Sequence, residues 1–303
     1  MTDRADALSW SGDAQTVRLS DGRALGFASY GDPDAPHTVV YFHGSGGSRL
    51  EHPTDPSTLS TLGVRLVATD RPGHGLSSPQ RDRRLEGWAS DVAQLADHLG
   101  AESFFVMGWS AGGPHALACA RYLPARVSAG AVVSGLAPFD RPRPYEGMPL
   151  GVRVLNMVGR SSPTSVRVVR GLMHRMVTGE PDVVAKRLSS SLPPPDRRLV
   201  QSPEVRAMLL ASVREGYRQG GLGPAEDDIV INSPWGFRLE DVRPRIDLWH
   251  GDLDQNVPIG QGRYQHEKLP HGSLTVVPGQ AHLMVVEHWR PILKRLVGHV
   301  SSP

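Results

Sequence analysis

The chain alternates short apolar runs with longer segments in which apolar residues recur every three or four positions. A short apolar run between turn-forming residues is typical of a strand, whereas the longer spacing is typical of an amphipathic helix. We predict strands at residues 16–19, 24–30, 38–42, 65–69, 104–108, 129–134, 245–249 and 273–277. Asp21-Gly22 makes the first two an antiparallel hairpin, and the later alternation with helices favours a mostly parallel sheet.

Three helices are predicted beside this sheet. Residues 85–99 carry apolar side chains at helical spacing up to Gly100, and glycine is typical of the position after a helix. Residues 111–122 are rich in small side chains and stop before Pro124, and residues 290–300 form a closing helix. The chain should therefore fold as an α/β protein.

The stretch from residue 140 to residue 239 interrupts the alternation, because it contains no strand-like run. It carries amphipathic segments at residues 151–158, 165–177, 182–188 and 205–219, interrupted by three consecutive prolines at 193–195. A simple crossover seldom needs so many residues. We therefore predict a helical lid inserted after the sixth strand. The expected domains are a core made of residues 14–139 and 236–303, and a lid made of residues 140–235.

Composition narrows the class of protein. The 303 residues carry a formal charge of +2, and the basic residues, nearly all Arg, are mixed with acidic ones, so a nucleic-acid partner is not expected. No run reaches the roughly 18–20 apolar residues of a membrane span, and residues 1–13 contain three Asp but no apolar signal region. We expect a cytoplasmic protein. Cys119 is the single cysteine, so no intrachain disulfide can form. The sequence does not indicate an oligomeric state.

The strongest chemical motif surrounds Ser110. The apolar run 104–108 leads into Gly108-Trp109-Ser110-Ala111-Gly112, and a small-residue helix follows. A serine on a sharp strand-to-helix turn needs small neighbours, which the two glycines supply. The same turn directs the Ala111 N–H, at a helix N-terminus, toward charge that develops on a substrate oxygen. We therefore predict that Ser110 is a nucleophile.

A second strand ends in the glycine-rich loop His43-Gly44-Ser45-Gly46-Gly47. Glycines let the backbone approach a ligand closely, and acyl transfer needs a second N–H donor facing the oxyanion, for which Ser45 is the candidate. A phosphate-binding loop is the alternative, but no Gly-Lys-Ser or Gly-Lys-Thr follows. His43 is more typical of a residue that organises the loop than of a base.

Two later loops supply candidates for an acid and a base. Asp252 and Asp254 follow the strand at 245–249, and either carboxylate could orient an imidazolium; we favour Asp254, although spacing alone does not separate them. His282 follows the last strand on a short loop. Because the carboxyl ends of parallel strands meet at one edge of a sheet, this loop can bring His282 to Ser110.

These motifs together resemble the α/β-hydrolase superfamily, in which nucleophile, acid and base follow one another in the chain as Ser110, Asp254 and His282 do here. The resemblance implies an eight-stranded, mostly parallel sheet flanked by helices, with Ser45 and Ala111 as oxyanion donors. Family members often have His directly before the nucleophile, where this chain has Trp109. We expect Trp109, together with His43 and Met284, to border the substrate pocket.

A serine nucleophile implies an acyl-enzyme, and aspartate, which dehalogenases and epoxide hydrolases of this fold use instead, is absent from that position. The leading hypothesis is hydrolysis of an ester, thioester, lactone or amide in a small or medium-sized apolar molecule. The alternatives are an acyltransferase, a C–C bond hydrolase or a tailoring enzyme with the same triad, and a slow or non-catalytic receptor. The sequence has no metal-ligand spacing, and we expect neither a metal nor a cofactor.

Overall fold

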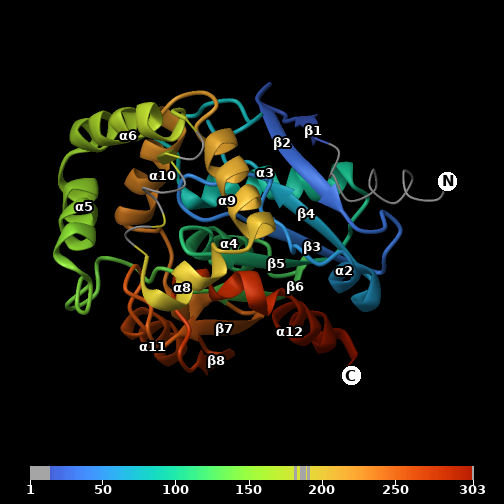
Figure 1. Cartoon of the computed structure of the whole chain (residues 1–303). Helices are drawn as coiled ribbons and strands as arrows, with labels where there is room; N and C mark the ends of the chain where they lie inside the picture. The colour runs from blue at the N-terminus through green and yellow to red at the C-terminus, as the bar shows by residue number, and fades with distance from the viewer. Residues whose placement is uncertain (1–13, 181–182, 185–188, 190–191, 302–303) are drawn as a thin grey trace.

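A computed structural model describes residues 14–301, with the exception of 181–182, 185–188 and 190–191. Its centre is one eight-stranded sheet in the order β1-β2-β4-β3-β5-β6-β7-β8 (Figure 1). All neighbouring strands are parallel except the pairs β1–β2 and β2–β4. The strands are β1 (Ala14–Arg18), β2 (Ala24–Tyr30), β3 (His37–Phe42), β4 (Val64–Thr69), β5 (Phe104–Trp109), β6 (Val127–Val133), β7 (Arg245–Gly251) and β8 (Gly272–Val277). The predicted fold class is confirmed.

Helices cover both faces of the sheet. Five belong to the regular alternation with the strands: α2 (Ser57–Leu62), α3 (Leu85–His98), α4 (Gly112–Tyr122), α11 (Gly260–Lys268) and α12 (Val285–Val297). Alternate side chains of β3 point to opposite faces, so Val40 and Phe42 join the core beneath α3 and α4. Val39 and Tyr41 join the core beneath α12. The sheet is therefore buried on both sides, as a parallel sheet requires.

The segment between β6 and β7 is called here the inserted segment (residues 134–244). Where the structure describes it, it consists of helices and connecting loops. Its α-helices are α5 (Leu150–Ser161), α6 (Pro163–Val177), α8 (Pro194–Leu199), α9 (Pro203–Gly216) and α10 (Leu222–Asn232). Figure 1 shows them gathered along one side of the sheet. The division into a core and a lid at residues 140 and 235 stays a prediction.

Several elements differ from those expected. The closing helix begins at Val285 rather than at residue 290, because Pro291 is accommodated inside it. The prolines at 193–195 do not interrupt a helix but start α8, since the first helical positions need no N–H donor. The short helices α2 and α11 and the buried α10 were not predicted. The expected helix at 182–188 falls largely outside the described residues.

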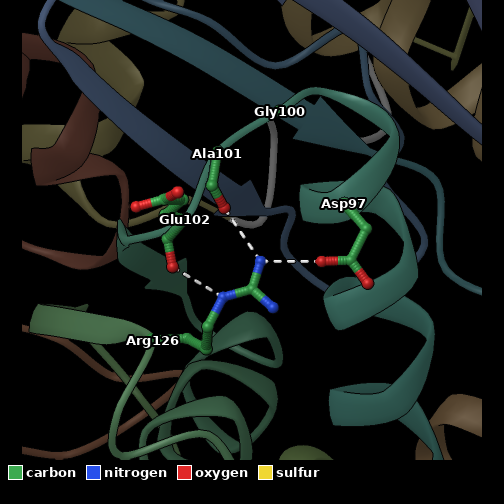
Figure 2. A pocket seen from close by; sticks show the side chains of 5 residues that line it. All are labelled: Asp97, Gly100, Ala101, Glu102 and Arg126. Atoms are coloured by element: carbon green, nitrogen blue, oxygen red, sulfur yellow. Dashed lines mark hydrogen bonds and ion pairs between the residues drawn. The ribbon is translucent and has the colours of Figure 1, made fainter.

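Arg126 lies just before β6 and contacts the segment that precedes β5 (Figure 2). Its guanidinium donates hydrogen bonds to the Glu102 carbonyl (2.6 Å), the Ala101 carbonyl (2.9 Å) and the Asp97 carboxylate (2.9 Å). These residues line a hollow of about 450 Å³. It lies at the opposite end of β5 from Ser110, so it is not part of the candidate active site. Within the described residues, no helix has both the length and the apolar character needed to cross a membrane.

Candidate active site

Ser110 follows β5 directly and adopts a left-handed backbone conformation, with φ at +54°. This conformation is costly for a residue with a side chain, and tight packing around the turn maintains it. A Cβ at Gly108 would lie 2.2 Å from the Gly112 carbonyl oxygen, and one at Gly112 would lie 2.1 Å from the Phe42 carbonyl oxygen. Both glycines are therefore needed for the turn to sit this close to β3.

The structure brings Ser110, His282 and Asp254 together from three different loops. The distance from Ser110 Oγ to His282 Nε2 is 2.9 Å, and His282 Nδ1 lies 2.8 Å from Asp254 Oδ2. The other oxygen of Asp254 accepts the N–H groups of Asn256 and Val257, both at 2.9 Å. Asp252 is engaged elsewhere, since its carboxylate accepts the Gly279 N–H. In this structure the imidazole is hydrogen-bonded to Asp254 and not to Asp252.

Burial and charge shift the pKa values of this pair in opposite directions. Burial lowers the pKa of His282, but Asp254 by its charge and hydrogen bond, and Asp196 by its charge, raise it, and the net pKa lies above the ordinary value. Burial raises the pKa of Asp254, but His282 and His250 lower it, and the net pKa lies below the ordinary value. Asp254 is therefore ionised at neutral pH and can stabilise a protonated His282.

The two residues expected to supply oxyanion N–H groups lie on different loops, Ala111 in the turn after β5 and Ser45 after β3. Ala111 is the N-cap of α4, and the first N–H groups of a helix have no acceptor within it. Ser45 is exposed on the loop after β3. Its hydroxyl accepts a hydrogen bond of 2.6 Å from Arg170 of α6. The neighbouring Gly44 N–H is already used, because it donates to the Glu51 carboxylate at 3.2 Å.

The three residues expected to border a substrate pocket are placed differently. Trp109 is 8% exposed, its ring lies 5.4 Å from the His282 ring, and its Nε1–H donates to the His282 carbonyl at 3.0 Å. His43 and Met284 are completely buried in this structure, and their part in a substrate pocket stays a prediction. His43 instead accepts the Arg71 N–H at 3.4 Å and contacts the Gly44 carbonyl, which fits a role in organising the loop.

Sequence reasoning missed the buried charged residues of the inserted segment, among them Arg170, Asp228 and Asp196. Arg170 of α6 pairs with Asp228 of α10 through two hydrogen bonds of 2.6 and 2.7 Å. Asp196 of α8 accepts the main-chain N–H groups of His282 and Leu283. The only sequence signal for them is their occurrence in otherwise amphipathic helices, and it does not distinguish a buried charge from an exposed one.

The chain matches the family model described as alpha/beta hydrolase fold over residues 37–288, well over half of its length, and it belongs to that family. A bifunctional esterase/perhydrolase of Acinetobacter calcoaceticus is 27% identical to it over 94% of this chain and 99% of the relative. A pimeloyl-(acyl-carrier protein) methyl ester esterase of Aromatoleum aromaticum is 27% identical over 82% of this chain and 92% of the relative.

Solved structures share the fold. A hydrolase from Pseudomonas aeruginosa superposes with a TM-score of 0.68 at 18% identity, covering 96% of this chain and 100% of the other. An enol-lactonase from Burkholderia xenovorans gives the same TM-score and identity, covering 95% of this chain and 100% of its own. At this identity the likeness shows the shared architecture alone.

Proposed function

We propose that the protein is a serine hydrolase that cleaves carboxylic ester bonds in small or medium-sized apolar molecules through an acyl-enzyme on Ser110. The observation that carries this proposal is the unbroken hydrogen-bonded chain from Ser110 Oγ through the imidazole of His282 to Asp254. A serine hydroxyl is a weak nucleophile unless a base takes its proton, and a base needs a third group to hold its tautomer and orientation.

In the first half of the proposed reaction, Ser110 Oγ attacks the carbonyl carbon of the ester and its proton moves to His282 Nε2. The imidazolium then gives that proton to the leaving alkoxide as the C–O bond breaks, which leaves the acyl group on Ser110. In the second half, a water molecule attacks the acyl carbon and loses a proton to His282. The carboxylic acid departs, and Ser110 regains its proton.

Negative charge on the carbonyl oxygen requires donors that are already in place. We assign this role to the N–H groups of Ala111, at the start of α4, and of Ser45, on the loop after β3. The close approach of the two loops supports the assignment, because Gly112 has no room for a Cβ against the Phe42 carbonyl oxygen. The partial positive charge of a helix N-terminus adds to the stabilisation.

The choice of esters is supported by the relatives that match most of this chain, two of which are named as esterases. We expect a small-molecule substrate. The depth of the site fits this size, because Ser110 and His282 each expose only 8% of their surface. The same triad could transfer the acyl group to an acceptor other than water, and product analysis distinguishes that outcome.

The test combines covalent labelling with turnover. A fluorophosphonate probe should label the wild-type chain, and p-nitrophenyl esters of increasing acyl length should be hydrolysed. Ser110→Ala should abolish labelling and lower kcat by about a million-fold. Asp254→Asn should lower kcat by about ten-thousand-fold, because it favours the wrong tautomer of His282.

Asp252→Asn is the matched control for the acid, because Asp252 lies on the same loop and its carboxylate accepts the Gly279 N–H. It should keep kcat within a few-fold of the wild type. A wild-type chain that is neither labelled nor active on any ester would contradict the proposed function. A larger loss for Asp252→Asn than for Asp254→Asn would overturn the assignment of the acid.

A further inference from the structure

Asp196, on the short helix α8 of the inserted segment, has no exposed surface. Its Oδ1 accepts the Leu283 N–H at 2.9 Å, and its Oδ2 accepts the His282 N–H at 3.2 Å. Among the residues that the structure describes, these two N–H groups are the ones that donate hydrogen bonds to the Asp196 carboxylate. A carboxylate from the inserted segment therefore binds the main chain of the residue proposed as the base.

The two N–H groups belong to the start of a helix. His282 begins a 3-10 turn, η2 (His282–Met284), which continues directly into α12, and the preceding Ala281 supplies no side-chain cap. The first N–H groups of a helix need acceptors from outside, and a negative charge is favoured there. Asp196 supplies both, from a position 86 residues earlier in the chain.

His282 is thus held from two sides. Its N–H binds Asp196, and its carbonyl accepts the Trp109 Nε1–H at 3.0 Å. Trp109 immediately precedes Ser110 in the chain. The hydrogen bond to the His282 carbonyl therefore comes from the loop of the nucleophile, whereas the hydrogen bond to its N–H comes from the inserted segment. With both ends of the residue fixed, the imidazole is left with side-chain torsions only, and the Asp254 contact restricts those.

The position of Asp196 is itself well defined. Pro194 and Pro195 occupy the first positions of α8, with Pro193 as the N-cap. Proline fixes φ and reduces the conformations open to the unfolded chain. The three prolines and residues 252–255, which include Asp254, line a common hollow of about 310 Å³. The start of α8 therefore lies beside the loop of the proposed acid and also touches that of the base.

We propose that Asp196 is a positioning residue: by binding the main chain of His282 and Leu283, it aligns the base with Ser110 and makes that alignment depend on the docking of α8. This inference rests on the proposed function, since it gives the inserted segment a part in aligning the triad. Asp196 touches no reacting atom. Its effect passes through the main chain of His282 and through its charge, which adds to that of Asp254.

The first measurement compares Asp196→Ala, Asp196→Asn and the wild type on the best p-nitrophenyl ester. Asp196→Ala leaves two N–H groups without an acceptor, and small displacements of a catalytic group cost up to about 100-fold in rate. We expect kcat to fall between about 10- and 100-fold, with KM within about twofold. Asp196→Asn keeps one oxygen acceptor in place and should recover most of kcat.

Arg198→Ala is the matched control. Arg198 also lies on α8, and it also reaches α12, through an exposed ion pair of 3.4 Å with Glu287. Exposed pairs contribute little, so this variant should keep kcat within about twofold of the wild type. An equal loss in Arg198→Ala would mean that any loosening of α8 has the same effect, and it would overturn the specific role of Asp196.

The pH profile of kcat/KM tests whether the charge of Asp196 acts on His282 or whether Asp196 has a merely structural role. The groups that face His282 are Ser110, Asp254 and Asp196, and His250 Nε2 lies 3.8 Å from Asp254 Oδ2, the same oxygen that contacts His282. Because the charge of Asp196 raises the pKa of His282, the acidic limb should move to lower pH in Asp196→Asn. An unmoved limb together with an unchanged kcat in Asp196→Asn and Asp196→Ala would refute the proposal.

Hydrogen exchange tests the contact without turnover. The amides of His282 and Leu283 should exchange at least tenfold faster in Asp196→Ala than in the wild type and in Arg198→Ala. Unchanged protection overturns the proposal even if the protein proves inactive on every ester. Failure of the wild type to bind the fluorophosphonate probe would instead count against the proposed function, so the two failures are distinguishable. If Asp196→Ala does not fold, the proposal is tested by the hydrogen exchange of these two amides and the pH profile of kcat/KM in Asp196→Asn.

Discussion

Glu51 lies beneath the loop that carries Ser45, and only 4% of it is exposed. Its Oε2 accepts the Tyr41 hydroxyl at 2.9 Å and the Gly44 N–H at 3.2 Å, and its Oε1 accepts the Ser212 hydroxyl at 3.1 Å. Burial raises the pKa of this carboxyl to about 7, although these hydrogen bonds and the nearby Arg71 lower it. Glu51→Gln keeps the shape and removes the titration.

The sign and size of the effect follow from the two pKa values. The carboxyl titrates near 4.5 in the unfolded chain and near 7 in the folded protein. Between these values the folded state holds more protons, so the free energy of unfolding falls as the pH rises through this window and is level above it. From pH 5 to pH 8 the wild type should lose about 2.5 kcal/mol relative to Glu51→Gln. For 303 residues this corresponds to about 4 °C in Tm.

The assay is urea or thermal unfolding of wild type and Glu51→Gln at several pH values from 5 to 8, with the difference in free energy plotted against pH. Using the difference removes the contribution of every other titrating group common to both proteins. Glu86→Gln, at an exposed position in the first turn of α3, controls for the chemical change, and its difference should stay within about 0.5 kcal/mol. A Glu51→Gln difference that is flat with pH, or that changes in favour of the wild type as the pH rises, would refute the reasoning.

Two further substitutions test the geometry around Ser110. Trp109→Phe removes the donor to the His282 carbonyl, a hydrogen bond worth about 1 kcal/mol, and should lower kcat about five- to tenfold with little change in KM; steady-state kinetics showing an unchanged kcat would rule this out. Gly112→Ala places a Cβ 2.1 Å from the Phe42 carbonyl oxygen and should destabilise the fold by about 3 kcal/mol or more. Its control is Gly87→Ala, where no atom lies within 4 Å, which should stabilise α3 by about 0.5–1 kcal/mol. Equal unfolding midpoints for the two alanine variants would contradict this account.

The strands, the turn at Ser110 and the loops of Asp254 and His282 could be predicted because their signals are local. Each lies where an apolar run ends in residues that favour a turn, and the parallel arrangement of the sheet brings such ends together. The spacing in the sequence could not show whether Asp252 or Asp254 is the acid, because the two residues differ in the groups to which each is hydrogen-bonded in the folded protein. Asp254 is hydrogen-bonded to the His282 imidazole, whereas Asp252 accepts the Gly279 N–H.

The inserted segment was the least predictable part for the opposite reason: its structure depends on contacts between residues distant in sequence. Helix α10 contains Gly223, Pro224 and three consecutive acidic residues, a composition typical of an exposed or irregular segment. The helix can be buried because those acidic residues form ion pairs with arginines elsewhere in the chain. One of these is Arg71, which lies 156 residues before Asp227. Asp196 escaped prediction similarly, since its partners lie 86 and 87 residues away.

The pairing of Asp227 with Arg71 and Arg83 limits how this enzyme could be recombined with others. Arg71 has no exposed surface, and it also donates to the carbonyls of His43 and Gly44 at 2.6 and 3.0 Å. Burial raises the pKa of Asp227, but the two arginines hold it well below the ordinary value. Removing α10 would leave these arginines without their counter-charge beneath the loop after β3. A chimera with another hydrolase should therefore keep α10 and, with it, α6, because Arg170 of α6 pairs with the buried Asp228 of α10.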